Sequence, residues 1–169
     1  PLQEVQFLLG LVIDYTKKHK NELIENGIRV IPVGRWNEMP QLVVSALKEV
    51  AKETEDCKNV ELYLAINYGG RQEILDAALA FARQCHERPS APDNLSEDEF
   101  SSFLYAKGIP DPDLIIRTSG EMRLSNFLLW QCAYSEFVFT ELCWPDFGPK
   151  ELYKAVDEFS RRSRRFGDV

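Results

Sequence analysis

The sequence predicts an α/β fold, with a mostly parallel β-sheet flanked by helices. Short apolar runs alternate with longer stretches in which hydrophobic residues recur every three or four positions. The short runs are continuously apolar, as expected for parallel strands that helices cover on both faces. Neither an internal repeat nor a linker is evident, so we treat residues 1–169 as a single domain.

Four strands are expected from their β-branched and apolar residues. They span residues 28–33 (IRVIPV), 60–66 (VELYLAI), 114–117 (LIIR) and 136–140 (EFVFT). The helical periodicity predicts helices over residues 4–26, 38–53, 71–86, 96–106, 124–134 and 149–165. Local signals support several helix ends, since Asn26-Gly27 suits a C-cap, Ser96 and Glu99 form a capping box, and Pro149 suits a first turn.

Composition narrows the functional classes. The 169 residues, of which 44% are hydrophobic, can form a sizeable core. The net charge is −7, from 20 basic and 27 acidic residues, which argues against a nucleic-acid-binding protein with a basic face. No apolar run is long enough to span a membrane, and no signal peptide is visible. The four cysteines lack metal or redox spacing, so we expect buried, reduced thiols in a cytoplasmic protein.

Polar residues follow the predicted strand at 114–117, where ligands bind in parallel α/β sheets. The strand ends in Arg117, and Arg123 and Ser125 come shortly after a Thr-Ser-Gly turn. A guanidinium group can donate two hydrogen bonds to the oxygens of one phosphate, and the N–H groups of a turn add further donors. The sequence therefore indicates a diphosphate clamp made by Arg117, Arg123 and Ser125. An ion pair of Arg117 with Glu121 or Asp113 would also explain a charge at this position.

Three further features have two interpretations each. Glu136 begins the fourth strand; it is either a solvated carboxylate or, beside a diphosphate, a ligand that helps to hold Mg²⁺. The segment NYGGR (67–71) is either a tight turn that needs glycine or backbone lining a pocket. The arginines over 161–165 either complement a helix C-terminus or belong to a site.

The segment PDLIIRTSGEMRLSNFLLWQCAYSEFVFTELCWPDF (112–147) resembles the signature of the cis-prenyltransferases. These are the Z-type polyprenyl diphosphate synthases typified by undecaprenyl diphosphate synthase. LAINYGGR (64–71) and RRSRRFG (161–167) are similar to two further motifs of that family. The resemblance covers about residues 1–167 and implies the α/β fold of that family.

The resemblance assigns roles to residues that match the family motifs. It implies that Arg117, Arg123 and Ser125 hold the diphosphate of isopentenyl diphosphate. It implies that Arg165 and Gly167 form an R-x-G element that reaches the partner subunit's site across a homodimer interface.

Further roles concern the pocket, the metal and the growing chain. By resemblance, Asn67 and Glu121 lie at the pocket, and Glu136 takes part in a network of Mg²⁺ and diphosphate. The first helix, over 4–26, resembles the family helix that walls a hydrophobic tunnel.

The reaction implied by the resemblance joins the carbon chains of two isoprenoid diphosphates. An allylic diphosphate, typically farnesyl diphosphate, loses pyrophosphate, and C4 of isopentenyl diphosphate attacks with loss of a proton and formation of a cis double bond. Mg²⁺ and arginine offset the charge on the departing group. The product is a cis-polyprenyl diphosphate such as undecaprenyl diphosphate, a cell-wall lipid carrier. Because a long polyprenyl chain partitions into lipid, peripheral membrane contact is expected.

The chain also departs from the family pattern. An aspartate motif like M-D-G-N-G-R-W and a segment like F-S-T-E-N-W are missing from these residues. Gly34-Arg35 stands where Gly-Asp is usual, and Gln72-Glu73 where Trp-Asp is common. The chain starts at Pro1 rather than Met, so we expect it to be the C-terminal two-thirds of the enzyme, inactive alone, with the catalytic aspartate upstream.

Two other interpretations remain open at the level of sequence. One is a non-catalytic subunit of a heteromeric cis-prenyltransferase, although such subunits generally lose the R-T-S-G-E-x-R block that is intact here. The other is an unrelated α/β module that binds a phosphate or a nucleotide.

Overall fold

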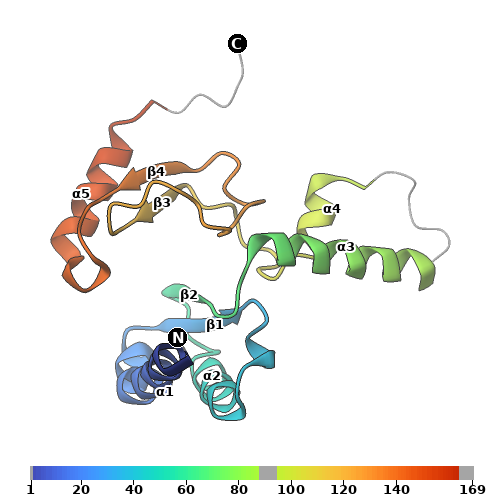
Figure 1. The fold of residues 1–169 in the computed structure, drawn as a ribbon, viewed down its shortest axis with the longest axis horizontal. Helices are drawn as coiled ribbons and strands as arrows, with labels where there is room; N and C mark the ends of the chain where they lie inside the picture. The colour runs from blue at the N-terminus through green and yellow to red at the C-terminus, as the bar shows by residue number, and fades with distance from the viewer. Residues whose placement is uncertain (1, 88–94, 164–169) are drawn as a thin grey trace. The chain divides into compact units, whose positions relative to one another are not determined.

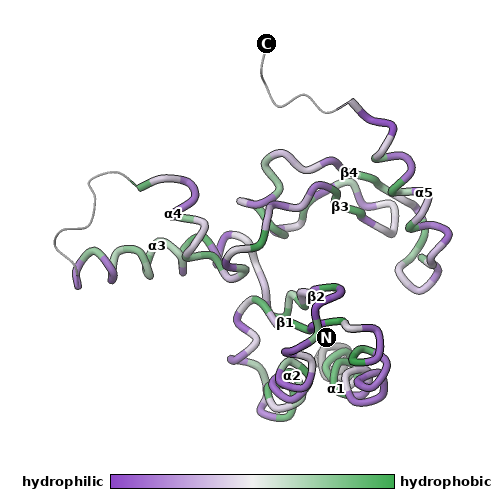
Figure 2. Tube along the Cα trace, turned by 180° about the vertical axis from the view of Figure 1, so that it is seen from behind, coloured by the Kyte–Doolittle hydropathy of each residue, from purple (hydrophilic) through white to green (hydrophobic). Residues whose placement is uncertain are grey.

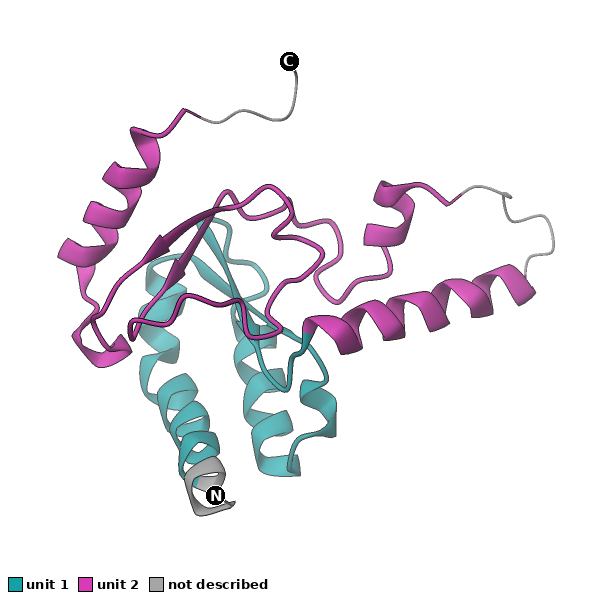
Figure 3. Ribbon diagram, turned by 45° about the horizontal axis from the view of Figure 1, so that its top comes forward, with its two compact units in different colours: residues 1–69 teal, residues 70–169 magenta. Residues whose placement is uncertain are grey.

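The computed structural model describes residues 2–87 and 95–163. The chain divides into two compact units, residues 1–69 and 70–169 (Figure 3). Each unit contains one pair of parallel strands with helices packed beside it. None of the helices in the described ranges is long and apolar enough to cross a membrane.

The first unit is a parallel strand pair with two long helices. Its elements are α1 (Leu2–Glu25), β1 (Ile28–Val33), the 3-10 helix η1 (Trp36–Glu38), α2 (Gln41–Glu53) and β2 (Val60–Ala65). The register of the two strands runs from Ile28 opposite Val60 to Val33 opposite Ala65. The two helices lie side by side against the strands (Figure 1), with hydrophobic and hydrophilic residues on different sides of each helix (Figure 2).

The core of the first unit lies between α2 and β1. The buried residues of this core are Val30, Val33, Val43, Val44, Ala46, Leu47 and Val50. Thr54 is also buried, and its hydroxyl accepts the Val30 N–H at 3.0 Å and donates to the Val50 carbonyl at 2.8 Å. Because both hydrogen bonds are made, this buried polar group is compatible with the core.

A crossed pair of hydrogen bonds joins the loops that follow β1 and β2. The Arg35 N–H donates to the Asn67 carbonyl at 3.2 Å, and Asn67 Nδ2 donates to the Arg35 carbonyl at 3.0 Å. Gly34, with φ of +97°, lets the two loops approach, since an added Cβ would lie 2.5 Å from the carbonyl oxygen of Ile66.

We expect Gly34→Ala to lower the free energy of unfolding by about 3 kcal/mol, because strain at a positive φ adds to a backbone clash. Gly108→Ala is the matched control, since Gly108 also has a positive φ, of +74°, but open space around it. The control should cost only about 1 kcal/mol. Urea unfolding of both variants measures the difference, and equal costs would contradict the close approach.

The second unit has a shorter strand pair. Its elements are α3 (Gly70–Glu87), α4 (Glu97–Ser101), β3 (Leu114–Arg117), β4 (Glu136–Phe139), the 3-10 helix η2 (Trp144–Asp146) and α5 (Pro149–Ser160). The strands are parallel, with Leu114 opposite Glu136 and Arg117 opposite Phe139. Helix α5 packs against β4, and α4 lies against α3 (Figure 1). Ser96 Oγ caps α4 by accepting the Glu99 N–H at 3.1 Å, as predicted.

The predicted α/β class, the parallel pairing and all four strands are confirmed. Gly27, with φ of +67°, ends α1 as predicted.

Helix α2 begins at Gln41 rather than 38 because Pro40 disfavours helix at the residue before it. Helix α4 ends at Ser101 instead of 106, and α5 at Ser160 instead of 165. In the described ranges the strands form two separate pairs, and Val60 and Leu62 of β2 are exposed, so burial of this strand on both faces is not observed.

The helix predicted over 124–134 is wrong, because this segment is a series of turns. Ser125, Asn126 and Leu128 have φ values of 50°, 64° and 44°, which a right-handed helix excludes. The segment is nevertheless anchored, since Gln131 and Cys132 are buried. Its apolar residues therefore contribute to packing without forming a helix.

Candidate diphosphate-binding site

The candidate site is built where β3 ends and an irregular loop begins. Arg117 is the last residue of β3, and its carbonyl accepts the Thr140 N–H at 2.9 Å. The following turn is fixed by the chain beyond β4, because the Ser119 N–H donates to the Leu142 carbonyl at 2.8 Å and the Gly120 N–H to the Thr140 carbonyl at 2.9 Å. The strand pair therefore sets the direction in which the loop leaves Arg117.

Two guanidinium groups converge on one hydroxyl in this loop. Arg117 Nη2 lies 3.4 Å from Ser125 Oγ, and Arg123 Nε lies 3.2 Å from the same oxygen. Both arginines line a cavity of about 200 Å³ whose other walls are apolar. Those walls are formed by Ile115, Ile116, Leu124, Phe127, Phe137 and Phe139. The structure thus brings together the three residues that the sequence predicted as a clamp.

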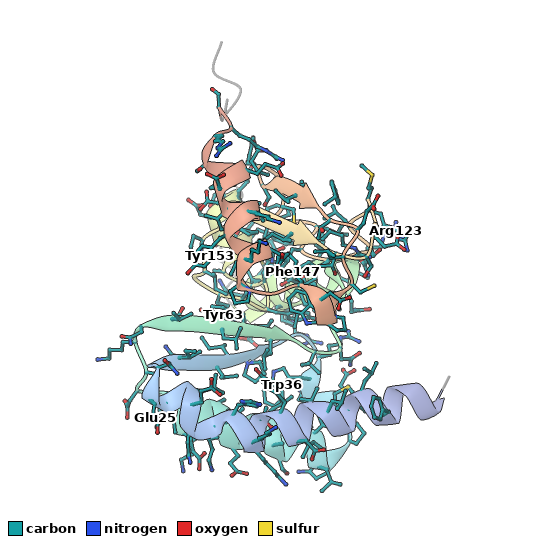
Figure 4. The ribbon with its side chains drawn as sticks, turned by 90° about the vertical axis from the view of Figure 1, so that its left-hand side faces the viewer. Glu25, Trp36, Tyr63, Arg123, Phe147 and Tyr153 are labelled. Atoms are coloured by element: carbon teal, nitrogen blue, oxygen red, sulfur yellow. The ribbon has the colours of Figure 1, made fainter. Side chains whose placement is uncertain are left out.

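The charge of the site is positive near Arg117. Glu121 forms an ion pair with Arg123, whose side chain is 64% exposed at the surface of the unit (Figure 4). Within the described ranges no ion pair to Arg117 is present, so the alternative that pairs it with Glu121 or Asp113 is wrong. An exposed pair such as Glu121–Arg123 is worth little and can open at low cost. An anion that binds here would therefore contact the half-buried guanidinium of Arg117, and the guanidinium of Arg123 could leave Glu121 to bind it at low cost.

Glu136 lies at the other end of the strand pair from Arg117. It is opposite Leu114 in the register, three residues or about 10 Å along the strands from the level of Arg117. Its Oε2 accepts from Arg162 Nη1 at 2.8 Å, and Arg162 also pairs with Glu158. The hydrogen bonds that Arg162 donates to Glu136 and Glu158 raise the pKa of its guanidinium group.

The carboxylates near the site do not form a metal-binding cluster among the described residues. Among the described residues there is no group of three or more His, Cys, Asp or Glu side chains placed for a metal ion. Glu121 and Glu136 are each held by an arginine. The described residues thus contain no cluster that would bind a metal ion through protein ligands alone, and Mg²⁺ would need phosphate oxygens beside one carboxylate.

The other predicted site residues lie in the first unit or outside the described residues. Asn67 belongs to the first unit, where its side chain bridges to the Arg35 carbonyl. Arg165 and Gly167 lie outside the described residues. Their roles at the pocket and at the homodimer interface stay predictions.

Sequence reasoning missed the residues that hold the loop in place. Asn126 bonds to the start of α3, and Glu73 in α3 bonds to Gln131 at the far end of the loop. Glu73 is 1% exposed. The only signal in the sequence was a glutamate within an otherwise apolar-periodic helix, which normally indicates a solvent-facing position.

The first unit carries an apolar cavity beside α1. Its volume is about 620 Å³, and its lining includes Leu8, Leu11, Val12 and Tyr15 of α1 with Leu64 of β2. This is the helix that resembles the family's tunnel wall. The cavity supplies apolar surface of the kind that a prenyl chain would contact.

Thiol chemistry is not indicated at the site. All four cysteines are free, but only Cys132 is buried as expected; Cys57 and Cys85 are half-buried and Cys143 is exposed. Burial raises the pKa of the Cys132 thiol, which keeps it protonated and unreactive near neutral pH.

The fold and the site define a class of protein. Parallel α/β strand pairs, guanidinium groups gathered at a strand end and a separate apolar cavity together suit a protein that handles a diphosphate with an apolar tail. The prenyltransferase family model for undecaprenyl diphosphate synthase matches residues 1–167. The chain belongs to this family.

The chain is similar along its whole length to bacterial isoprenyl transferases. It is 44% identical to that of Clostridium acetobutylicum over 172 residues, covering 100% of this chain and 67% of the relative. It is 42% identical to that of Listeria monocytogenes over 169 residues, again covering 100% of this chain and 67% of the relative. The chain thus spans about two-thirds of the length of these curated relatives.

Solved structures show the same fold. Lavandulyl diphosphate synthase from Lavandula x intermedia, in complex with dimethylallyl diphosphate, matches with a TM-score of 0.95 and 33% identity, covering 99% of this chain and 73% of that chain. A probable undecaprenyl diphosphate synthase from Campylobacter jejuni matches with a TM-score of 0.84 and 30% identity, covering 99% of this chain and 76% of that chain. The α/β fold predicted from the sequence is therefore the fold of this family.

Proposed function

We propose that the chain is part of a cis-prenyltransferase that condenses isopentenyl diphosphate with an allylic diphosphate, farnesyl diphosphate being the expected one. The product would be a cis-polyprenyl diphosphate such as undecaprenyl diphosphate. The observation that carries this proposal is the convergence of Arg117 and Arg123, which line one cavity, on Ser125 Oγ. The complex of the lavender enzyme with dimethylallyl diphosphate, an allylic diphosphate, supports the substrate class.

In this proposal the cluster binds the diphosphate of isopentenyl diphosphate. The two guanidinium groups donate hydrogen bonds to phosphate oxygens in place of Ser125 Oγ. The Ser125 hydroxyl, no longer held by the arginines, then donates a hydrogen bond to the ligand as well. The apolar walls of the cavity lie beside the guanidinium groups and would contact the isoprenyl part of the ligand. The cavity beside α1 would receive the growing apolar chain.

Mg²⁺ remains a predicted cofactor, and Glu136 remains its predicted carboxylate ligand. When bound, Mg²⁺ would offset negative charge on a diphosphate. The Arg162–Glu136 ion pair would have to open for Glu136 to serve as a ligand.

Homodimer formation is part of the same proposal. Leu75 and Leu79 lie one turn apart on α3 and are 58% and 55% exposed, so a second copy could bury them. We expect the complete protein to sediment as a dimer, and Leu75→Glu with Leu79→Glu to shift it toward monomer because the interface would then bury charge. The matched control is Leu152→Glu, at an exposed leucine of α5, and a dimer unaffected by the α3 changes would exclude α3 from the interface.

Product analysis tests the proposed activity. The complete gene product is incubated with labelled isopentenyl diphosphate and farnesyl diphosphate, and the chain length and double-bond geometry of the products are measured. Formation of a cis-polyprenyl diphosphate is the expected result. Binding of isopentenyl diphosphate without any product would favour a non-catalytic subunit, and absence of both would overturn the proposal.

A further inference from the structure

We propose that Asn126 is a positioning residue for the diphosphate site, because it caps helix α3 from a distant part of the chain and thereby fixes the loop that carries Ser125. This inference rests on the proposed function. It concerns the segment 124–131, the loop between Leu124 and Gln131, which we call the clamp loop.

Asn126 makes two hydrogen bonds to the first turn of α3. Its carbonyl accepts the Gly70 N–H at 2.7 Å, and its Oδ1 accepts the Arg71 N–H at 2.9 Å. The first N–H groups of a helix have no partner within the helix, and an asparagine side chain commonly satisfies one of them. Such a cap normally precedes the helix directly, whereas Asn126 lies 55 residues further along the chain. The start of α3 and the clamp loop are therefore tied together by capping.

The backbone of the clamp loop explains why asparagine suits this position. Asn126 has φ of 64°, in the left-handed region that most side chains avoid and asparagine tolerates. Ser125 and Leu128 are also left-handed, so the loop keeps an unfavourable conformation that its surroundings must stabilise. Asn126 provides both the tolerated conformation and the stabilising cap.

Close packing restrains the same loop next to the cap. An added Cβ on Gly70 would lie 2.8 Å from Leu129 Cγ and 3.0 Å from the Leu129 N, so no larger side chain fits there. At the end of the loop, Gln131 Nε2 donates to Glu73 Oε2 at 3.1 Å in a buried environment. Helix α3 thus holds the clamp loop at its middle and at its end.

The cap is directly connected to the predicted ligand-binding atoms. Ser125 precedes Asn126, and its Oγ is the point on which Arg117 and Arg123 converge, at 3.4 and 3.2 Å. A shift of about 1 Å would break both contacts, since a hydrogen bond weakens steeply beyond these distances. Releasing the cap should therefore impair diphosphate binding without removing any group that touches the ligand.

Three substitutions in the complete protein separate the two contributions of Asn126. Asn126→Gly tolerates the left-handed backbone but removes the Oδ1 cap. Asn126→Ala removes the Oδ1 cap and also disfavours the left-handed backbone. Asn126→Asp keeps an acceptor for the Arg71 N–H. We expect the Kd for inorganic pyrophosphate to rise about fivefold for Gly and about thirtyfold for Ala, on the scale of a lost cap and added backbone strain. Hydrogen exchange in the clamp loop should accelerate for Gly and Ala and stay slow for Asp.

The controls distinguish positioning from general stability. Asn59→Ala removes another asparagine side chain that bonds to the backbone of a distant segment, since Asn59 Nδ2 donates to the Asn26 carbonyl in the first unit. It should lower the Tm and leave the pyrophosphate Kd unchanged. Gly70→Ala offers a second route to the same displacement of the loop and should weaken binding even if Asn126→Ala fails to fold.

The outcomes separate this inference from the proposed function. If Arg117→Ala weakens pyrophosphate binding while Asn126→Gly and Gly70→Ala do not, the positioning role is overturned and the proposed function survives. If Arg117→Ala has no effect on binding, the proposed function fails, and this inference fails with it.

Discussion

Replacement of Arg117 by alanine is expected to weaken binding of inorganic pyrophosphate, and of isopentenyl diphosphate, by about 100-fold. Arg117 is half-buried at the end of β3 and donates to Ser125 Oγ, without an ion pair among the described residues. Its charge is therefore available to the ligand, and a pair of charge-assisted hydrogen bonds is worth about 3 kcal/mol. Isothermal titration of the complete protein measures the loss.

The size of the effect should differ between the two arginines. Arg123 is more exposed than Arg117 and is already paired with Glu121, so binding must first break that ion pair. We expect Arg123→Ala to cost about tenfold in affinity, since an exposed charge contributes less than a shielded one. Arg117→Lys should fall between wild type and Arg117→Ala, because an ammonium keeps the charge but cannot bind two oxygens with the guanidinium geometry.

Arg161→Ala is the matched control for the clamp. Arg161 is exposed and paired with Asp157, so its removal changes the net charge by the same amount at a place away from β3. Equal losses for Arg161→Ala and Arg117→Ala would show that the protein attracts anions through general charge rather than through a clamp. A loss confined to Arg117 and Arg123 supports the site.

The convergence of these arginines could be foreseen because it depends on chain order and strand geometry alone. LIIR is continuously apolar and ends in a charge, and the carboxyl ends of parallel strands are where ligands bind. The position of Glu136 depends on the register of β3 against β4, which the sequence does not specify. Because the strands are parallel, the start of β4 lies at the opposite edge of the pair from the end of β3, and the register places Glu136 three residues from the level of Arg117.

The clamp loop could not be foreseen for a different reason. Its apolar residues have the spacing of a buried helix, and periodicity does not reveal the positive φ values of Ser125 and Asn126. Those values are stabilised by Gly70 and Arg71, more than 50 residues earlier in the chain. The local spacing of apolar residues favours a helix in this segment, but the hydrogen bonds to the start of α3 hold it in a non-helical conformation.

Glu73 shows how far such distant contacts extend. It lies within α3 at 1% exposure, and its two carboxylate oxygens serve different segments. Oε1 accepts the Tyr105 N–H at 3.0 Å, and Oε2 accepts from Gln131 Nε2 at 3.1 Å. One buried side chain thus joins α3 to the chain after α4 and to the end of the clamp loop. Its removal would take one hydrogen-bond acceptor from the half-buried Tyr105 N–H and another from the buried Gln131 amide.

We expect Glu73→Ala to lower the free energy of unfolding by about 4 kcal/mol, from the loss of both hydrogen bonds and the cavity left behind. Glu73→Gln should cost about 1 kcal/mol, since the new amide keeps an oxygen for the Tyr105 N–H. Its amide nitrogen can donate to Gln131 Oε1, which has no hydrogen-bond partner in the described structure, once the Gln131 amide turns over. Urea unfolding followed by circular dichroism measures both variants.

Glu49→Ala provides the matched control for Glu73→Ala. Glu49 also lies in a helix and contacts Lys20 at 3.4 Å, but it is exposed, so its loss should cost less than about 1 kcal/mol. The pyrophosphate Kd adds a second criterion, because Glu73→Ala releases Gln131 and with it the end of the clamp loop, whereas Glu49→Ala leaves that loop untouched. If the two alanine variants unfold at the same urea concentration, Glu73 does not anchor the second unit, and the rigidity that we assign to the clamp loop must come from Asn126 and Gly70 alone.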